Sequence, residues 1–156
     1  AQSRMLEPLR KRLTDERKAA SELSTDESGA DALPMPIGRW EFEGDFKDHV
    51  GGAHGEPRGD ASIASGQLVV HASAYVVTKP IDRTLRAKTL EAWVQLDDLA
   101  QQGGGVMSIQ SLDGSVFDSI VFAEQAPRQW LSGSEFFNRT QSFGGDAENE
   151  ADRRLV

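Results

Sequence analysis

The sequence predicts an all-β fold, an antiparallel sandwich or barrel, preceded by one helix. The main observation is that from residue 37 onward apolar and polar residues alternate in short runs, as they do in half-buried strands. Gly, Asp, Ser and Pro separate these runs, as expected for turns. Asp113-Gly114 lies between two such runs, and Asp-Gly is a strong signal for a tight hairpin. Short strands at this spacing favour an antiparallel arrangement over βαβ units.

Residues 1–23 are predicted to form a helix, and residues 24–36 a linker. The helix is indicated by apolar residues at three- and four-residue spacing with charged residues between them, namely Met5, Leu6, Leu9, Leu13, Ala20 and Leu23. The linker has no periodicity, and its two prolines favour extended backbone before them. The change in composition there is the expected boundary of a sandwich domain that covers residues 37–156.

The predicted strands of this domain occupy residues 38–44, 61–64, 67–71, 74–79, 89–97, 105–112, 116–124 and 128–132. Residues 51–60 are predicted to be a turn-rich loop. In the run 89–97, Trp93 is expected to be a core residue, although alternation places it on the more polar face, opposite Val94 and Leu96. Either the core bends this pattern, or Trp93 covers a second apolar layer. The charged tail 144–154 has little pattern, and Leu155-Val156 is expected to begin a further strand, which would leave the sandwich incomplete.

Composition excludes several classes of function. The chain has 156 residues, which suits one domain with a tail. A net charge of −8 disfavours nucleic acid and anionic membrane surfaces as partners. The absence of cysteine excludes disulfides, thiolate metal sites and a cysteine nucleophile. No apolar run approaches the ~20 residues that a membrane-spanning helix needs, so membrane insertion is not expected.

An ordered set of short motifs carries a family resemblance over residues 39–143. These motifs are Trp40-Glu41-Phe42, the Gly-rich loop that begins at Asp48, Gly66-Gln67-Leu68, Ala74-Tyr75-Val76 and Thr89 to Val94. Together they resemble laminin-G-like jelly-roll domains of the concanavalin A-like lectin/glucanase superfamily. The runs GGGVMSIQ and FDSIVFAE are similar to versions in large planctomycete proteins, where the module follows a helical segment and lies among cytochrome-like and unknown-function domains.

The resemblance implies a jelly-roll β-sandwich that acts as a non-catalytic binding module for carbohydrate or protein surfaces. It also implies a periplasmic or extracellular location and neighbouring domains in the same chain. The later strand and the Tyr-x-Asn-Gly hairpin of the family are missing here, so open strand edges and an uncovered apolar face are expected. A structural spacer between domains and a glycoside hydrolase-like domain are the alternative functions.

The predicted ligand-binding residues are Trp130, Phe136, Asn138 and Arg139. An exposed aromatic ring can stack on the apolar face of a sugar, while amide and guanidinium groups bind its hydroxyls. The alternative is that Trp130, Phe136 and Phe137 are buried against one another, because large aromatic side chains usually supply core area.

Asp45 and Asp48, beside a Gly-rich loop, are the candidate ligands of a calcium ion. Calcium takes six to eight oxygens, so two carboxylates are only part of a site. The alternative is that Asp48 hydrogen-bonds its own turn. The histidines 49, 54 and 71 lack a third ligand of the kind that zinc needs.

No catalytic residues are predicted, and the chain is not expected to be an enzyme. Glu41, Glu43 and Asp45 alternate, so a strand would place them on one face. Paired carboxylates are the machinery of glycoside hydrolysis. The simpler interpretation is that Trp40 and Phe42 face the core while the acids face water.

Overall fold

The computed structural model describes residues 35–156, so the predicted helix at 1–23 and nearly all of the linker lie outside the described residues. The chain divides into two compact units that meet in sequence at Asp82 and Arg83. Every strand pair in the described part is antiparallel, and the sole helical element there is one 3₁₀ turn. The described chain is therefore all-β, as predicted. Within it, no helix is long and apolar enough to cross a membrane.

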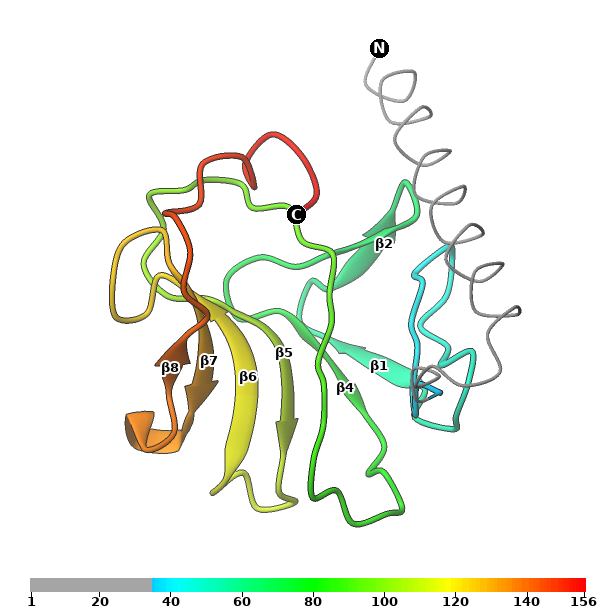
Figure 1. The fold of residues 1–156 in the computed structure, drawn as a ribbon. Coiled ribbons are helices and arrows are strands. Elements are labelled where there is room, and N and C mark those ends of the chain that lie inside the picture. The colour runs from blue at the N-terminus through cyan, green and yellow to red at the C-terminus, as the bar shows by residue number, and fades with distance from the viewer. Residues whose placement is uncertain (1–34) are drawn as a thin grey trace, which may run out of the picture. The chain divides into compact units, whose positions relative to one another are not determined.

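The first unit contains two antiparallel strand pairs. Strand β1 (Gly55–Arg58) pairs with β4 (Tyr75–Thr78), and β2 (Ser62–Ala64) pairs with β3 (Gln67–Val69) (Figure 1). The β2–β3 turn is Ser65-Gly66, with φ of 54° and 71°. Positive φ at both central residues is the geometry that matches the twist of a hairpin. The predictions of strands at 61–64, 67–71 and 74–79 are confirmed, with shorter ends.

Strand β1 lies inside the segment that was predicted to be a loop. Its sequence, GEPR, has little strand propensity, and its backbone is extended because β4 supplies the partner ladder. Gly55 is required there, because a Cβ atom would lie 2.6 Å from Val76 Cγ1 and 3.2 Å from the Phe46 carbonyl oxygen. Tertiary pairing thus overrides the local turn signal.

The predicted strand at 38–44 is wrong. Trp40 forms only an isolated bridge with Asp48, and Phe42 has a left-handed backbone, with φ of 55°. The indole Nε1 of Trp40 donates to the Ala53 carbonyl oxygen at 2.9 Å. Because the backbone turns at Phe42, the alternation of Glu41, Glu43 and Asp45 does not define one strand face.

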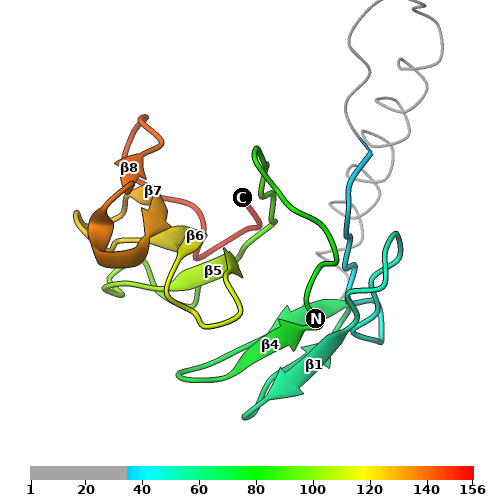
Figure 2. The ribbon, with the colours of Figure 1, turned by 90° about the horizontal axis from the view of Figure 1, so that it is seen from below.

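The second unit is a four-stranded meander in the order β5-β6-β7-β8 (Figures 1 and 2). Its elements are β5 (Gly105–Gln110), β6 (Phe117–Phe122), β7 (Trp130–Ser134), the 3₁₀ turn η1 (Glu135–Phe137) and β8 (Gln141–Ser142). The Asp-Gly hairpin is confirmed between β5 and β6: Ser111 N donates to Val116 O at 2.8 Å, and Gly114 has φ of 70°. Strand β8 has too short a pattern to be predicted.

The core of the second unit surrounds Phe122, whose side chain is fully buried. The Trp130 ring packs on it, with ring centroids 4.7 Å apart. Leu99, Ala123 and Ala151 complete the buried cluster, and Leu96, Trp130 and Val156 border it. Residue Ala151 belongs to the charged tail, so a segment with little sequence pattern covers part of the core.

The segment 89–97 alternates between half-buried and exposed side chains, but it does not form one of the strands of the structure. Trp93 was expected in the core, and this is wrong, because its side chain is on the exposed face and 50% exposed. The segment pairs with the end of the chain rather than with a named strand. Val94 and Val156 exchange two backbone hydrogen bonds of 3.0 Å each, and Leu96 N donates to Ala151 O at 2.7 Å. Leu155-Val156 does not form a named strand, but Val156 is held against this segment by these bonds.

Candidate functional site

The four predicted ligand-binding residues lie at the two ends of β7. Trp130 begins the strand, at the core, and its Nε1 donates to Glu148 Oε2 at 2.9 Å. The other three follow the strand, on the turn between β7 and β8. The structure therefore separates Trp130 from Phe136, Asn138 and Arg139, and gives Trp130 the role of a core residue.

The turn after β7 holds two aromatic residues in an uncommon backbone conformation. Phe136 and Phe137 have φ of 49° and 59°, in the left-handed region. Phe136 is 89% exposed and Phe137 is 52% exposed, so the two rings are not buried against each other. For residues with a Cβ atom this conformation costs roughly 1–2 kcal/mol each, so the surroundings must hold it.

Arg139 is the residue that holds the turn. Its Nη2 donates to Asp118 Oδ1 at 2.8 Å and to the Phe117 carbonyl oxygen at 3.0 Å, both at the start of β6. Both of its terminal nitrogens also bind Glu135, at 2.5 and 3.0 Å. The backbone N–H of Arg139 donates to Ser134 Oγ at 2.8 Å. The guanidinium is thus used to join the turn to the sheet.

The charges around Arg139 stabilise one another. Hydrogen bonds from Lys88 and then from Arg139 lower the pKa of Asp118, and a hydrogen bond from Arg139 lowers the pKa of Glu135. Glu135 and Asp118 in turn raise the pKa of Arg139. Two cations and two carboxylates therefore form a chain of ion pairs with no net charge, in the order Lys88, Asp118, Arg139 and Glu135.

Asn138 is the polar group of this turn that is available to a ligand. Its side chain is exposed, and within residues 35–156 its amide makes no hydrogen bond. It lies two residues from the Phe136 ring, so an aromatic face and a free donor and acceptor occur on the same braced turn.

The β5–β6 hairpin lies at the same end of the sheet, because Phe117 begins β6 where β7 ends (Figure 1). It adds Leu112, which is 88% exposed, and Val116, which is 48% exposed. We call the set Leu112, Val116, Phe136 and Phe137 the apolar end. It is the most aromatic-rich exposed surface that the described sheet presents at its turns.

The candidate calcium ligands are both occupied by protein groups. The carboxylate of Asp48 is buried and accepts four backbone N–H bonds, and Oδ1 of Asp45 accepts from Lys47 N at 3.0 Å. Across residues 35–156, no group of three or more His, Asp or Glu side chains is placed to hold a metal ion. Asp48 therefore hydrogen-bonds the backbone of its own turn, which is the alternative to calcium binding given above.

The histidines and acids of the first unit are also dispersed. His54 Nδ1 accepts from Asp48 N at 3.2 Å, while His49 faces Asp45 at 3.9 Å. Glu41 forms an ion pair with Arg39 at 3.3 Å, and Asp45 forms one with Lys47 at 3.1 Å. These contacts give each group a local structural role.

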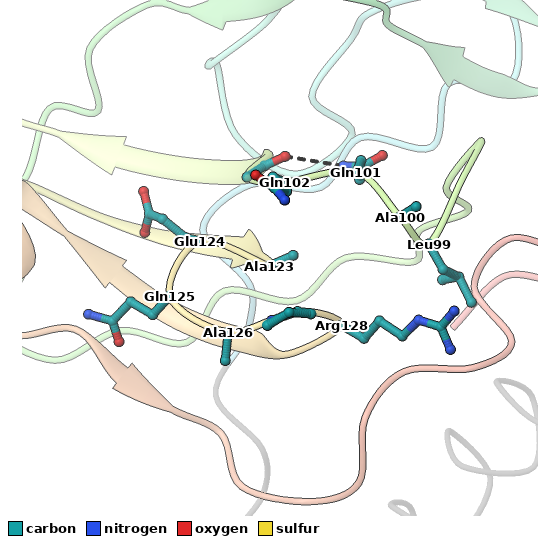
Figure 3. A pocket seen from close by; sticks show the side chains of 11 residues that line it. Leu99, Ala100, Gln101, Gln102, Ala123, Glu124, Gln125, Ala126 and Arg128 are labelled. Carbon is teal, nitrogen blue, oxygen red and sulfur yellow. Dashed lines mark hydrogen bonds between the residues drawn. The ribbon is translucent and has the colours of Figure 1, made fainter.

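A hollow of about 690 Å³ lies between two segments of the second unit, residues 99–103 and 123–128 (Figure 3). The second segment is the connection between β6 and β7. Sequence reasoning missed this site, because no motif marks it. The signal that was available is compositional: glutamines gather in both segments, at 101, 102 and 125.

No family model, curated protein or solved structure matches the chain. The resemblance to laminin-G-like domains therefore depends on the quoted residues alone.

Proposed function

We propose that this chain is a non-catalytic binding module whose contact surface is the turn between β7 and β8, and that its ligand is carbohydrate. The observation that carries the proposal is the exposure of Phe136, at 89%, on a left-handed turn braced by Arg139. A contact held in place before binding loses little freedom on binding. A large exposed apolar ring without a structural role is a candidate for recognition.

Carbohydrate is favoured by the pairing of Phe136 with the free amide of Asn138. A pyranose ring offers one apolar face and a rim of hydroxyls, which match an aromatic face and a donor–acceptor amide. The laminin-G-like jelly-roll resemblance supports the same ligand class. A location outside the cytoplasm, in a larger multidomain protein, belongs to this proposal and depends on the same resemblance.

A protein surface is the second candidate ligand. The supporting observation is that Leu112 and Val116 are further exposed apolar side chains at the same end of the sheet as Phe136. Burial of exposed apolar surface favours protein–protein association. The spacer and hydrolase-like alternatives find less support, since the braced aromatic turn has no evident use in either.

A glycan array probed with the full chain tests the proposal, with Phe136→Ala and Asn138→Ala as the site variants. Phe143→Ala is the matched control, because Phe143 is 58% exposed but lies at the Trp130 end of β7. We expect each site variant to weaken glycan binding about tenfold, equivalent to ~1.4 kcal/mol. The control is expected to bind as the wild type does.

The array, a protein-binding assay and a hydrolysis assay together separate the alternatives. If Leu112→Ser weakens binding to a protein partner while Asn138→Ala has no effect, the apolar end binds protein. Equal signals for the wild type and Phe136→Ala on every glycan would contradict the carbohydrate proposal and favour the spacer. Release of reducing sugar from a β-glucan that is abolished by Glu41→Gln or Glu43→Gln would instead favour a hydrolase.

A further inference from the structure

The first residues of the second unit, 83–93, form no regular structure. They contain neither strand nor helix, and Figure 1 draws them as a plain tube between β4 and β5 in the chain. Within residues 35–156, the first backbone N–H of this unit that finds a backbone acceptor is that of Val94, which donates to Val156 O at 3.0 Å. In the described chain, the backbone donors and acceptors of residues 83–93 are therefore unused.

The first ion pair along this segment is made by Lys88. Its Nζ binds Asp118 Oδ2, at the start of β6. Arg83 and Arg86 precede Lys88, are exposed, and form no ion pair or hydrogen bond with any described residue. The polar attachments of the segment to its own unit thus begin directly after Arg86 and Ala87.

Arg83 and Arg86 differ in this respect from the other cations of the described chain. Most of the others form ion pairs, namely Arg39, Lys47, Arg58, Lys88, Arg139, Arg153 and Arg154. Arg128 has no ion pair, but its carbonyl oxygen accepts from Glu148 N at 2.8 Å. Lys79 is followed by Pro80, whose ring and missing N–H obstruct cleavage of the bond before it. Within residues 35–156, an unpaired cation, an unbonded backbone and a following residue other than proline therefore coincide only at Arg83 and Arg86.

These three properties are what an endoprotease requires of a substrate. The protease pairs with the substrate backbone as a sheet pairs with an added strand, so the substrate must offer several residues with unused N–H and C=O groups. An unpaired guanidinium can enter a pocket that ends in a carboxylate and bind it through two parallel hydrogen bonds. Proteolysis is also fastest where little native structure has to open first.

We propose that residues 83–87 are a processing site, at which an endoprotease specific for arginine cuts the chain after Arg86, and also after Arg83. The reaction is hydrolysis and consumes one water molecule. The water hydroxyl adds to the carbonyl carbon of the arginine, the C–N bond to the next residue breaks, and the proton passes to the departing nitrogen. This inference does not depend on any ligand at Phe136.

The position of the cut leaves the second unit with its own contacts. A product that begins at Ala87 keeps the ion pair between Lys88 and Asp118. It also keeps both hydrogen bonds between Val94 and Val156, and the four-stranded meander. The fragment 87–156 is therefore expected to persist as a folded product after cleavage.

The test is limited digestion of the full chain with trypsin, followed by intact mass spectrometry and identification of the new N-termini. Among cuts within residues 35–156, new N-termini at Ala87 and Thr84 should form about tenfold faster than any other, because the other cleavable sites lie in bonded structure. Fragment 87–156 should then accumulate. A new N-terminus at Thr89, or inside either unit's strands, that forms as fast would overturn the proposal. Digestion of fragment 87–156 as fast as it forms would also overturn it.

Two variants make the test specific to the two arginines. The double variant Arg83→Gln/Arg86→Gln changes only exposed side chains, so it should fold, and it should slow cleavage within residues 35–156 about tenfold. Arg128→Gln is the matched control, because Arg128 is also exposed and unpaired, and the Ala87 terminus should form from it at the wild-type rate. Cleavage of the double variant at the wild-type rate would show that another segment opens more easily, and would contradict the assignment.

Discussion

Asp48 organises the first unit through its carboxylate. Oδ1 accepts from the N–H groups of Arg39, Val50 and Gly51, each at 2.9 Å, and Oδ2 accepts from Ala53 N at 3.1 Å. The residues that donate lie on both sides of Asp48 in sequence, so one side chain closes the loop 39–53. Since Asp48 is 95% buried, the four donors to its carboxylate also supply the solvation that water would otherwise give.

The first prediction is that the Asp48 carboxylate makes the free energy of unfolding decrease at acidic pH. Burial alone would raise the pKa of Asp48, but the hydrogen bonds from Gly51, Arg39, Val50 and Ala53 outweigh burial and lower the pKa from 3.8 to about 2. The folded state therefore binds this proton less readily than the unfolded state. The contribution, about 2 kcal/mol, is fully present above pH ~4 and is lost as pH falls toward ~2. Urea unfolding at several pH values measures it.

Asp48→Asn is the control for this prediction. The variant keeps the size of the side chain but replaces one acceptor with a donor, so it should be less stable than the wild type at neutral pH. It should also lose the part of the acid dependence that Asp48 supplies. An unchanged pH profile in the variant would contradict the assignment.

The second prediction compares two neighbouring glycines. A Cβ atom on Gly51 would lie 2.7 Å from both Asp48 Oδ2 and the Ile37 carbonyl oxygen, whereas a Cβ on Gly52 would meet nothing within 4 Å. We expect Gly51→Ala to lower the free energy of unfolding by about 2 kcal/mol, a typical penalty for forced overlap. Gly52→Ala is the matched control and should change it by less than ~0.5 kcal/mol. Thermal unfolding of both variants, followed by circular dichroism, gives the comparison.

At the scale of elements, β7 joins a core residue at one end to an exposed contact surface at the other. Trp130 packs on Phe122 and ties Glu148 to the sheet. Glu148 Oε1 then accepts the N–H groups of residues 149–151, which caps the turn that brings Ala151 into the core. In the turn after β7, the hydrogen bonds of Arg139 instead hold a backbone conformation in which the Phe136 side chain is exposed.

The third prediction follows from this division. Trp130→Ala should lower the free energy of unfolding of the chain by about 3 kcal/mol, because it leaves a cavity beside Phe122 and removes the bond to Glu148. Phe136→Ala should change it by less than ~0.5 kcal/mol, because the ring is exposed. Chemical denaturation compares the two directly. Similar losses in both variants would show that the Phe136 ring has a role in the core.

A comparison of the strands shows which local sequence signals are sufficient to predict a strand. The hairpin of β5 and β6 is predicted correctly, since alternation and the Asp-Gly turn both act within a few residues. The strand expected at 38–44 fails because the hydrogen bonds of Trp40 and Arg39 go to a loop ten or so residues further on. The alternation of apolar and polar residues does not predict such distant hydrogen-bond partners.

For the whole molecule, the notable feature is how much apolar surface stays exposed. Large apolar side chains with more than a third of their surface accessible include Met35, Ile37, Val50, Val70, Tyr75, Val77, Trp93, Leu112, Val116, Phe136, Phe137 and Phe143. Such residues indicate a binding surface only where they gather in one place, as Leu112, Val116, Phe136 and Phe137 do at one end of the four-stranded sheet.

The fourth prediction concerns this surface. The double variant Leu112→Ser/Phe136→Ser should bind less of a hydrophobic fluorescent dye than the wild type and precipitate at a higher ammonium sulfate concentration. Its unfolding free energy should stay within ~0.5 kcal/mol of the wild type, because both side chains are exposed. A double variant Met35→Ser/Val70→Ser, outside the apolar end, controls for polarity alone. Equal effects of the two double variants would argue against a localised apolar end.

The sequence by itself determined the all-β class and the β5–β6 hairpin, because alternation and turn chemistry depend on near neighbours. The tertiary structure alone decided that β1 is a strand, that Trp130 is in the core while Phe136 is exposed, and that Asp48 serves a loop. It also created the hollow between residues 99–103 and 123–128. Each of these depends on which distant groups supply hydrogen bonds and cover apolar surface, and no local pattern in the chain encodes that.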